Sequence, residues 1–463
     1  MKASAAALPL LVLGGGVWAW AHYGHSTIRH ATEAEVRSVV PADLLPTTVA
    51  DPAAMQRFGQ LANVCKGIDF NWDIDTSAAT QRQNIKDLGA NGGCVDVAKL
   101  IMRKGPIKAP PGGSMLKNWQ YLTTLAHALA FQSRIAGAAG DHRLCFQSIN
   151  DGLALAKAVC SAGGGANGYY EFATVDTIAV HNAADCVREG DLTPAQQRYL
   201  MAEVAGFGRS NTQEKEDLKQ ELSNRLYEPS YGVVSLASEF SVPANNPDEE
   251  DETGNFDTVQ TAKLLTRLFA IWVDNGGRDW RSRDQSATKL MASLDAELPK
   301  DPWRTTANTD VEGRRVPSSS EKVAFQAAMN AIPNSAGIRL ISEEVDWGQR
   351  MEEDSARISC NHALLIVSIG IAEYRADHQG QLPSTLDELV TGEYLERVPT
   401  DAFSGRPLRY DPRSGSVYSV GADGTDDNGK FGRELDRSEP DYGLFSTAKP
   451  LAALKQAATK DRH

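Results

Sequence analysis

The sequence predicts a mainly α-helical N-terminal domain, built as a bundle of helical hairpins, and a smaller C-terminal α+β domain. Apolar residues recur at three- and four-residue spacing between 116 and 135, which is typical of an amphipathic helix. Similar helical stretches continue to about residue 378. After Gly380 and Pro383, short apolar stretches alternate with turns rich in glycine, aspartate and proline, a pattern that favours strands.

The composition is that of a globular protein with room for more than one core. The chain has 463 residues, for which two or three domains are expected. Its residues are 41% hydrophobic and 23% charged, and its net charge is −13. Because binding to phosphates needs a cationic surface, this charge argues against nucleic acid as the main partner.

The first segment of the chain indicates export. Residues 3–21 contain no charged side chain and are mostly apolar. The stretch 19–21, Ala-Trp-Ala, fits a small-x-small signal-peptidase site, which predicts cleavage before His22. An uncleaved anchor is the alternative, and a buried N-terminal helix in a cytosolic protein is a third interpretation. We therefore expect residues 1–25 to be a signal peptide or an N-terminal membrane anchor. The rest of the chain would then lie in the periplasm or at the outer face of the inner membrane. The membrane would be contacted only through this segment, if it stays uncleaved.

The six cysteines are compatible with disulfide bonds in an exported chain. Cys145 and Cys186 lie on two predicted helices at equal distance from the middle of the loop that joins them, so an antiparallel hairpin brings them side by side. This pair is the first disulfide candidate, and Cys65 with Cys94 is the second. The alternative is a set of buried free thiols. Because no CxxC motif is present, we expect no zinc site.

The helical domain is predicted to span residues 30–334. Its clearest helix start is Thr193–Pro194, where threonine caps the helix and proline occupies the first turn. Two polar loops, 241–256 and 299–320, interrupt the domain. The helices predicted after residue 114 occupy 115–140, 140–160, 169–187, a stretch from 194 onward, 210–228, 257–274 and 283–297.

The C-terminal domain is predicted to span residues 335–446, followed by a tail at 447–463. It begins with a helix from Ser335 to about His378. The apolar run within this helix, 363–372, is too short to cross a bilayer, so we expect it to be buried under the sheet that follows. Strands are predicted at 407–411, 416–421 and 442–446.

Three short motifs follow one another along this domain. The first lies at the helix exit, the second is a proline-x-aspartate loop, and the third is a strand end with two glycines and an aspartate. Their residues are Tyr374, Asp377, Gly380 and Pro383, then Pro399, Asp401, Phe403, Gly405 and Pro407, and then Ser419, Gly421, Asp423 and Gly424.

This ordered series, between about 356 and 446, resembles the periplasmic part of type II secretion major pseudopilins. The resemblance implies a long helix packed on a small antiparallel sheet. Pseudopilins begin with a prepilin-peptidase site, and this chain has none, since its similar helix lies far from the N-terminus. The resemblance therefore implies a reused fold module inside an exported α-helical protein.

The resemblance also implies a calcium ion at the loop 417–429, which we call the acidic loop. Ca²⁺ takes six to eight oxygen ligands from carboxylates and carbonyls on a flexible turn. Asp423, Asp426 and Asp427 can supply carboxylates from the loop, and Asp441 can close the shell from the other side. The alternative is an ordinary turn rich in aspartate that is exposed to water.

An EF-hand is a second way to bind calcium with the same loop. Asp423, Thr425, Asp427 and Glu434 fit its positions one, three, five and twelve. However, Asn428 stands where glycine is required, and a strand is predicted before the loop in place of a helix. The sequence therefore argues against an EF-hand.

No enzyme motif is present in the sequence. HExxH, GxSxG, the P-loop and GxGxxG are all missing. His127, His142 and His181 fall on predicted helices, and one of them paired with Asp141 or Asp185 could act as a general base. The alternative is a structural role for each histidine.

We expect a structural or protein-binding role with protein partners in the cell envelope. The alternatives are a periplasmic hydrolase with its site in the helical domain and an accessory subunit of a type II secretion or pilus-like system.

Overall fold

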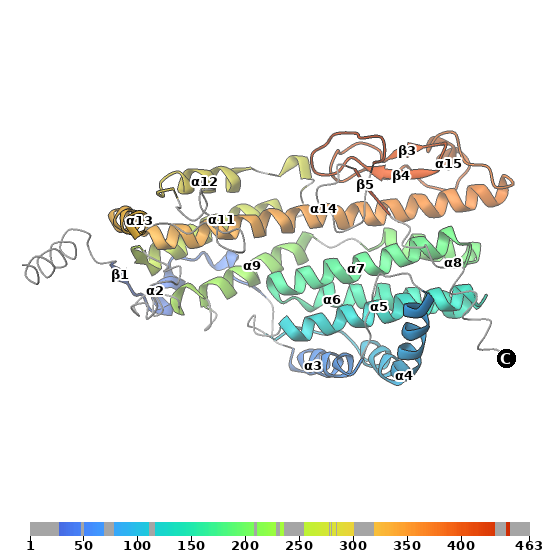
Figure 1. Cartoon of the computed structure of the whole chain (residues 1–463), viewed down its shortest axis with the longest axis horizontal. Coiled ribbons are helices and arrows are strands. Elements are labelled where there is room, and N and C mark those ends of the chain that lie inside the picture. The colour runs from blue at the N-terminus through green and yellow to red at the C-terminus, as the bar shows by residue number, and fades with distance from the viewer. Residues whose placement is uncertain are drawn as a thin grey trace, which may run out of the picture. The chain divides into compact units, whose positions relative to one another are not determined.

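The protein is mainly α-helical with a small antiparallel sheet near the C-terminus, as the sequence predicts (Figure 1). Residues 1–25 and 447–463, for which a signal or anchor and a tail are predicted, lie outside the described residues. The computed structural model describes residues 27–47, 51–68, 78–110, 116–207, 211–227, 232–235, 254–276, 278, 280–283, 285–300, 319–430 and 441–444.

The chain divides into two compact units. The first unit comprises Met1–Pro46, Glu221–Asp274 and Asp284–Gly348. The second comprises Thr47–Gln220, Asn275–Arg283 and Gln349–His463, so it contains most of the predicted helical domain together with the C-terminal sheet. The domain boundary expected at residue 335 stays a prediction.

The second unit contains a series of helical hairpins. Gly163 and Gly164 form the turn between α6 and α7, and Gly165 begins α7. Their φ angles are 74°, 107° and 64°, in a left-handed region that residues other than glycine rarely adopt. Asp141 caps α6, and Thr193 forms a capping box with Gln196 at the start of α8. The helices are α3 (Pro52–Lys66), α4 (Ala78–Arg103), α5 (Leu116–Ala138), α6 (His142–Ala162), α7 (Gly165–Arg188), α8 (Pro194–Ala205) and the first part of α9 (Asn211–Tyr227).

Helix α14 (Ser335–Asp377) matches the long helix predicted from Ser335 to about His378. In the second unit it packs on the hairpins, where Leu365 and Ile369 join a core with residues of α5 to α8. It is the one described helix that is long and apolar enough to cross a membrane, over Arg350–Asp377. However, 67% of that window is buried within the protein, as expected of a core helix.

The C-terminal sheet packs on the other side of α14. Leu364, Val367 and Ile371 share a core with Phe403, Leu408 and Val417. The strands are β3 (Arg409–Asp411), β4 (Ser416–Ser419) and β5 (Tyr442–Gly443), antiparallel in the order β3-β4-β5. All three predicted strands are confirmed in position, although each is shorter than predicted. A short helix, α15 (Asp387–Thr391), lies between α14 and the sheet in the sequence.

The first unit contains shorter elements and one that the sequence did not predict. This element is a parallel pair of two-residue strands, β1 (Ile28–Arg29) and β2 (Phe256–Asp257). The last residue of the predicted loop 241–256 is therefore a strand residue. The helices of this unit include α2 (Glu33–Ser38), the 3-10 turn η1 (Ala42–Leu44), the last part of α9 from Glu221, α12 (Ser286–Asp295), α13 (Ser319–Ala331) and the start of α14. Helix α11 (Thr258–Asn275) belongs to this unit up to Asp274.

Candidate functional site

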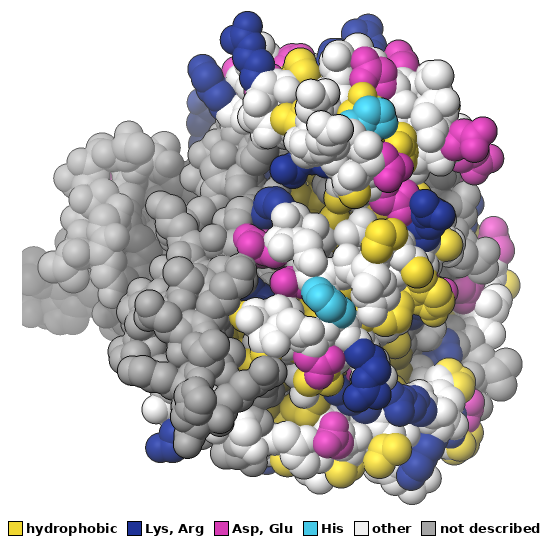
Figure 2. Space-filling model, turned by 90° about the vertical axis from the view of Figure 1, so that its right-hand side faces the viewer, with side chains coloured by type: hydrophobic (Ala, Val, Ile, Leu, Met, Phe, Trp, Pro, Cys, Tyr) yellow, Lys and Arg dark blue, Asp and Glu magenta, His cyan; other side chains and the backbone are white. Residues whose placement is uncertain are grey.

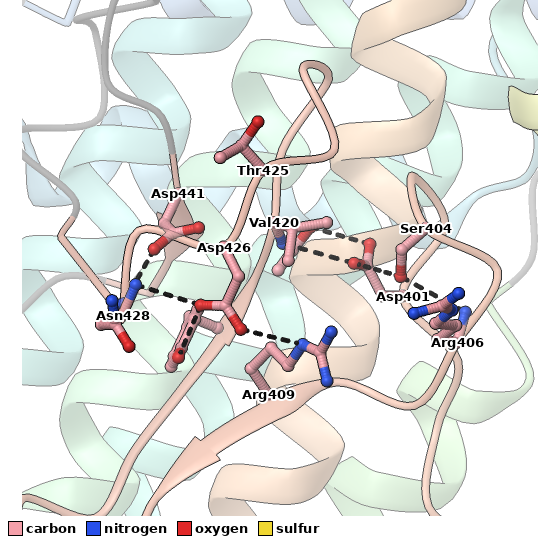
Figure 3. Close-up of polar contacts among 12 residues, drawn as sticks. Asp401, Ser404, Arg406, Arg409, Val420, Thr425, Asp426, Asn428 and Asp441 are labelled. Atoms are coloured by element: carbon pink, nitrogen blue, oxygen red, sulfur yellow. Dashed lines mark hydrogen bonds and ion pairs between the residues drawn. The ribbon is translucent and has the colours of Figure 1, made fainter.

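The proline-x-aspartate loop is organised around the carboxylate of Asp401, which is 1% exposed. Oδ1 accepts hydrogen bonds from Phe403 N at 2.9 Å and Ser419 Oγ at 2.7 Å. Oδ2 accepts from Ser404 Oγ at 2.7 Å and Val420 N at 3.3 Å (Figure 3). Because a buried carboxylate is costly unless it is hydrogen-bonded, this set of donors explains why an aspartate can occupy the core here.

The same carboxylate joins two of the motifs that carry the pseudopilin resemblance. Phe403 and Ser404 belong to the loop 399–407, whereas Ser419 and Val420 form the strand end at the start of the acidic loop. On the α14 side, Cys360 Sγ lies 3.4 Å from Asp401 Oδ1. These motif residues therefore have a structural role, which is to fix the start of the acidic loop against α14.

Within the acidic loop, two of the predicted calcium ligands cap their own turns. Asp423 Oδ1 accepts from Thr425 N at 2.9 Å, and Asp426 Oδ1 accepts from Asn428 N at 3.0 Å. Asp426 is also tied to the sheet, since its Oδ1 accepts from Tyr418 OH at 3.1 Å and its Oδ2 lies 3.3 Å from Arg409 Nε (Figure 3). These contacts are those of an aspartate-rich turn.

Asp441, the residue directly before β5, closes the acidic loop and has one carboxylate oxygen without a partner among the described residues. It is 2% exposed, and its Oδ2 accepts from Gly429 N at 2.8 Å. Among the described residues, its buried Oδ1 has no hydrogen-bond partner. Burial raises the pKa of Asp441, the charges of Asp426 and Asp427 raise it further, and hydrogen bonds from Asp427 N and Gly429 N oppose these effects.

The acidic loop and Asp441 provide some, but not all, of the ligands that a calcium site needs. A buried, unpartnered carboxylate oxygen close to two further carboxylates is what a hard cation would satisfy. However, within the described part of the chain, no three of the four predicted aspartates bring their oxygens within 4.8 Å of one another. An ion would therefore need backbone carbonyls or a movement of the loop to complete its shell. Glu434, the last EF-hand position, lies outside the described residues.

The two predicted cysteine pairs are brought together. Cys145 and Cys186 lie side by side, as the hairpin predicts, with free thiols. Cys65 and Cys94 also have free thiols; burial and the neighbouring Cys94 raise the pKa of Cys65 to about 12. Both disulfide bonds stay predictions.

The three histidines that the sequence singled out, His127, His142 and His181, lie on α5, α6 and α7, and His181 is buried. Burial lowers the pKa of His127 to about 4, so this imidazole is neutral at pH 7. His142 Nδ1 lies 2.6 Å from the backbone oxygen of Asp191. Asp141 caps α6 through Leu144 N, and Asp185 pairs with Arg188 at 2.8 Å.

A buried histidine–carboxylate pair occurs elsewhere, where the sequence analysis did not predict it. His362 Nε2 of α14 lies 2.9 Å and 3.1 Å from the two oxygens of Asp176, an α7 residue that is fully buried. Beside it, Asn361 donates to Thr177 Oγ1 at 3.3 Å and accepts from Tyr442 OH. The one sequence feature that points to this contact is the pair of polar residues, Asn361 and His362, next to the apolar run of α14. Nothing in the sequence indicates that their partners lie on α7.

No family model, no curated protein and no solved structure matches this chain.

At the end of the molecule shown in Figure 2, acidic, basic and hydrophobic side chains are interspersed over the described surface. Function must therefore be inferred from individual residues and their contacts.

Proposed function

We propose that the chain is an exported cell-envelope protein with a structural or protein-binding role. In this proposal the C-terminal module is pseudopilin-like and is stiffened by calcium. The observation that carries it is the buried Asp401, whose carboxylate joins the loop 399–407 to the strand end at Ser419 and Val420. Two of the three motifs on which the resemblance depends are thus in contact through one carboxylate, which supports the proposal of a single pseudopilin-like module.

Calcium would be held by Asp441 and by the neighbouring carboxylates of Asp426 and Asp427, with Asp423 as the outermost predicted ligand. The ion would neutralise the repulsion that raises the pKa of Asp441 and would satisfy its Oδ1. It would also tie Asp441, the residue before β5, to the acidic loop, in addition to the hydrogen bond that Asp441 accepts from Gly429 N. We expect a stiffer module and no chemical step.

The location is tested by fractionation of cells that express the full chain. The proposal predicts recovery from the periplasm or the inner membrane, and recovery from the cytoplasm alone would contradict it. A matched chain without residues 1–25 should remain in the cytoplasm. Binding to secretion-machine components, tested with the purified chain and purified components, would favour the accessory-subunit alternative.

The hydrolase alternative has one observation in its favour, the contact between His362 and Asp176. A histidine held by a carboxylate is a usual arrangement for a general base. However, the His362 side chain is only 10% exposed and Asp176 is not exposed at all. Loss of a measured hydrolase activity in His362→Gln, with the fold retained, would support this alternative.

A further inference from the structure

A second group of ligand-type side chains lies at the opposite end of the α6–α7 hairpin from its glycine turn. It consists of Cys145 in the first turn of α6, Cys186 in the last turn of α7 and Asp191 in the turn before α8. One ligand atom from each lies within 4.8 Å of the other two, and all three residues are buried. We call this group the Cys₂Asp cluster.

The position of Asp191 is fixed from several sides. Its backbone N–H donates to Cys186 O at 3.0 Å, and its carbonyl oxygen accepts from His142 Nδ1 at 2.6 Å. Space for its carboxylate comes from Gly137 of α5, because a Cβ there would lie 2.2 Å from Asp191 Oδ2. The carboxylate is thus built into the core beside the two sulfurs.

The three side chains offer the ligand types that a borderline-soft divalent cation takes, two thiolates and one carboxylate. A divalent cation favours the thiolate form of a cysteine, so the ion would bind both sulfurs after their protons are lost.

We propose that Cys145, Cys186 and Asp191 bind one Zn²⁺ ion in the reduced protein. Zn²⁺ takes thiolate and carboxylate ligands together and prefers four of them. The fourth ligand would be a water molecule, because Ser133 Oγ, which lies 3.9 Å from Cys186 Sγ, is already hydrogen-bonded to Ala130 O and to the Asn182 side chain. On binding, each thiol loses its proton to solvent and the sulfur bonds to the metal, so two protons are released for each ion. The absence of a CxxC motif argued against zinc only for ligands that are close in sequence.

The site is tested with Co²⁺, which replaces Zn²⁺ and gives a thiolate-to-metal absorption band. Reduced full-length protein should bind one equivalent with this band, and added Zn²⁺ should remove it. Cys186→Ser should lose the band. Asp191→Asn should weaken Co²⁺ binding by at least about tenfold, since even outer-shell changes cost 10- to 100-fold in affinity. Gly137→Ala, which crowds the carboxylate, should also weaken it.

The matched control is Cys65→Ser, which removes an equally buried thiol beside Cys94. Within the described residues that pair has no third ligand close by, so the band should be retained. Circular dichroism establishes that each variant is folded, and Asp191→Asn keeps the test decisive if Cys186→Ser does not fold. The proposal is overturned if reduced wild-type protein gives no band, or if Cys65→Ser abolishes it while Asp191→Asn does not weaken it. The zinc proposal does not depend on the proposed calcium site.

Discussion

Two buried aspartates in the C-terminal α+β region have opposite surroundings. Asp401 is 1% exposed, and each of its carboxylate oxygens accepts hydrogen bonds from the loop and from the strand end. Asp441 is 2% exposed, yet one of its oxygens is buried without a partner among the described residues. Burial is nearly the same, so the difference lies in the donors around each carboxylate.

Because of this difference, we interpret Asp401 as a structural residue and Asp441 as a candidate metal ligand. A carboxylate whose oxygens all have donors stabilises the fold as it stands. A buried oxygen without a donor destabilises the fold unless another group satisfies it. Asp401 therefore stabilises the packing of the loop 399–407 on the strand end, and the unpartnered oxygen of Asp441 indicates where a cation would stabilise the fold most.

The largest effect is expected at Asp401. Asp401→Ala leaves the hydroxyls of Ser404 and Ser419 and two backbone N–H groups without their acceptor, so we expect a loss of about 3 kcal/mol or more of unfolding free energy. Urea denaturation followed by circular dichroism measures this. Asp401→Asn keeps part of the network and should cost less. A loss below about 0.5 kcal/mol in Asp401→Ala would show that the network is not structural.

A third carboxylate, Glu171 of α7, provides a pH test of the same reasoning. It accepts from Thr123 N at 2.8 Å and from Thr123 Oγ1, but burial outweighs these bonds and raises its pKa from 4.5 to about 7. The unfolded chain then loses this proton at lower pH than the folded protein. Glu171 should therefore reduce stability progressively as the pH rises from about 4.5 to about 7.

The expected change is up to about 3 kcal/mol across that window, because one pKa unit corresponds to 1.36 kcal/mol. Melting temperatures of wild type and Glu171→Gln should be compared between pH 5 and pH 7.5. The wild type should lose stability relative to Glu171→Gln as the pH rises. A constant difference between the two proteins would contradict the raised pKa.

The next effect concerns Asp441 and calcium. An ion that binds only the folded state stabilises it by about 2.7 kcal/mol at a concentration of 100 times its Kd. We expect Ca²⁺ to raise the melting temperature of wild type and to have no effect on Asp441→Asn. Without calcium, Asp441→Asn should be as stable as wild type or more stable, because it removes the repulsion from Asp426 and Asp427. Calorimetric melting with Ca²⁺ and with chelator measures both effects.

The smallest effect is expected at Asp423, an exposed residue that accepts one backbone hydrogen bond from Thr425. Asp423→Ala should change the unfolding free energy in chelator by about 0.5 kcal/mol or less, as for other surface positions. It should also reduce the calcium response less than Asp441→Asn does. An equal or larger reduction would place the centre of the ion site in the loop, away from Asp441.

The local elements could be predicted from the sequence because their signals are local. The long helix from Ser335, the cap at Thr193 and the three C-terminal strands follow from apolar spacing, capping residues and turn composition. The strand pair β1–β2 was not predicted, because two residues are too few to show an alternating pattern.

The candidate sites could be predicted only in part. The aspartates of the acidic loop and the proximity of Cys145 and Cys186 follow from the sequence, because a loop or a hairpin relates them. The contact of His362 with Asp176 joins residues 186 positions apart, and nothing local specifies it. Asp191 was missed as a neighbour of the cysteines because its position depends on the turn after α7 and on the space left by Gly137.

The most direct test of the calcium proposal is isothermal titration of Ca²⁺ into chelator-treated full-length protein, with Asp441→Asn as the matched control. The account predicts one binding site in wild type and none in Asp441→Asn, with both proteins folded. No heat of binding in wild type, or the same binding in both proteins, would contradict the role given to the unpartnered oxygen of Asp441.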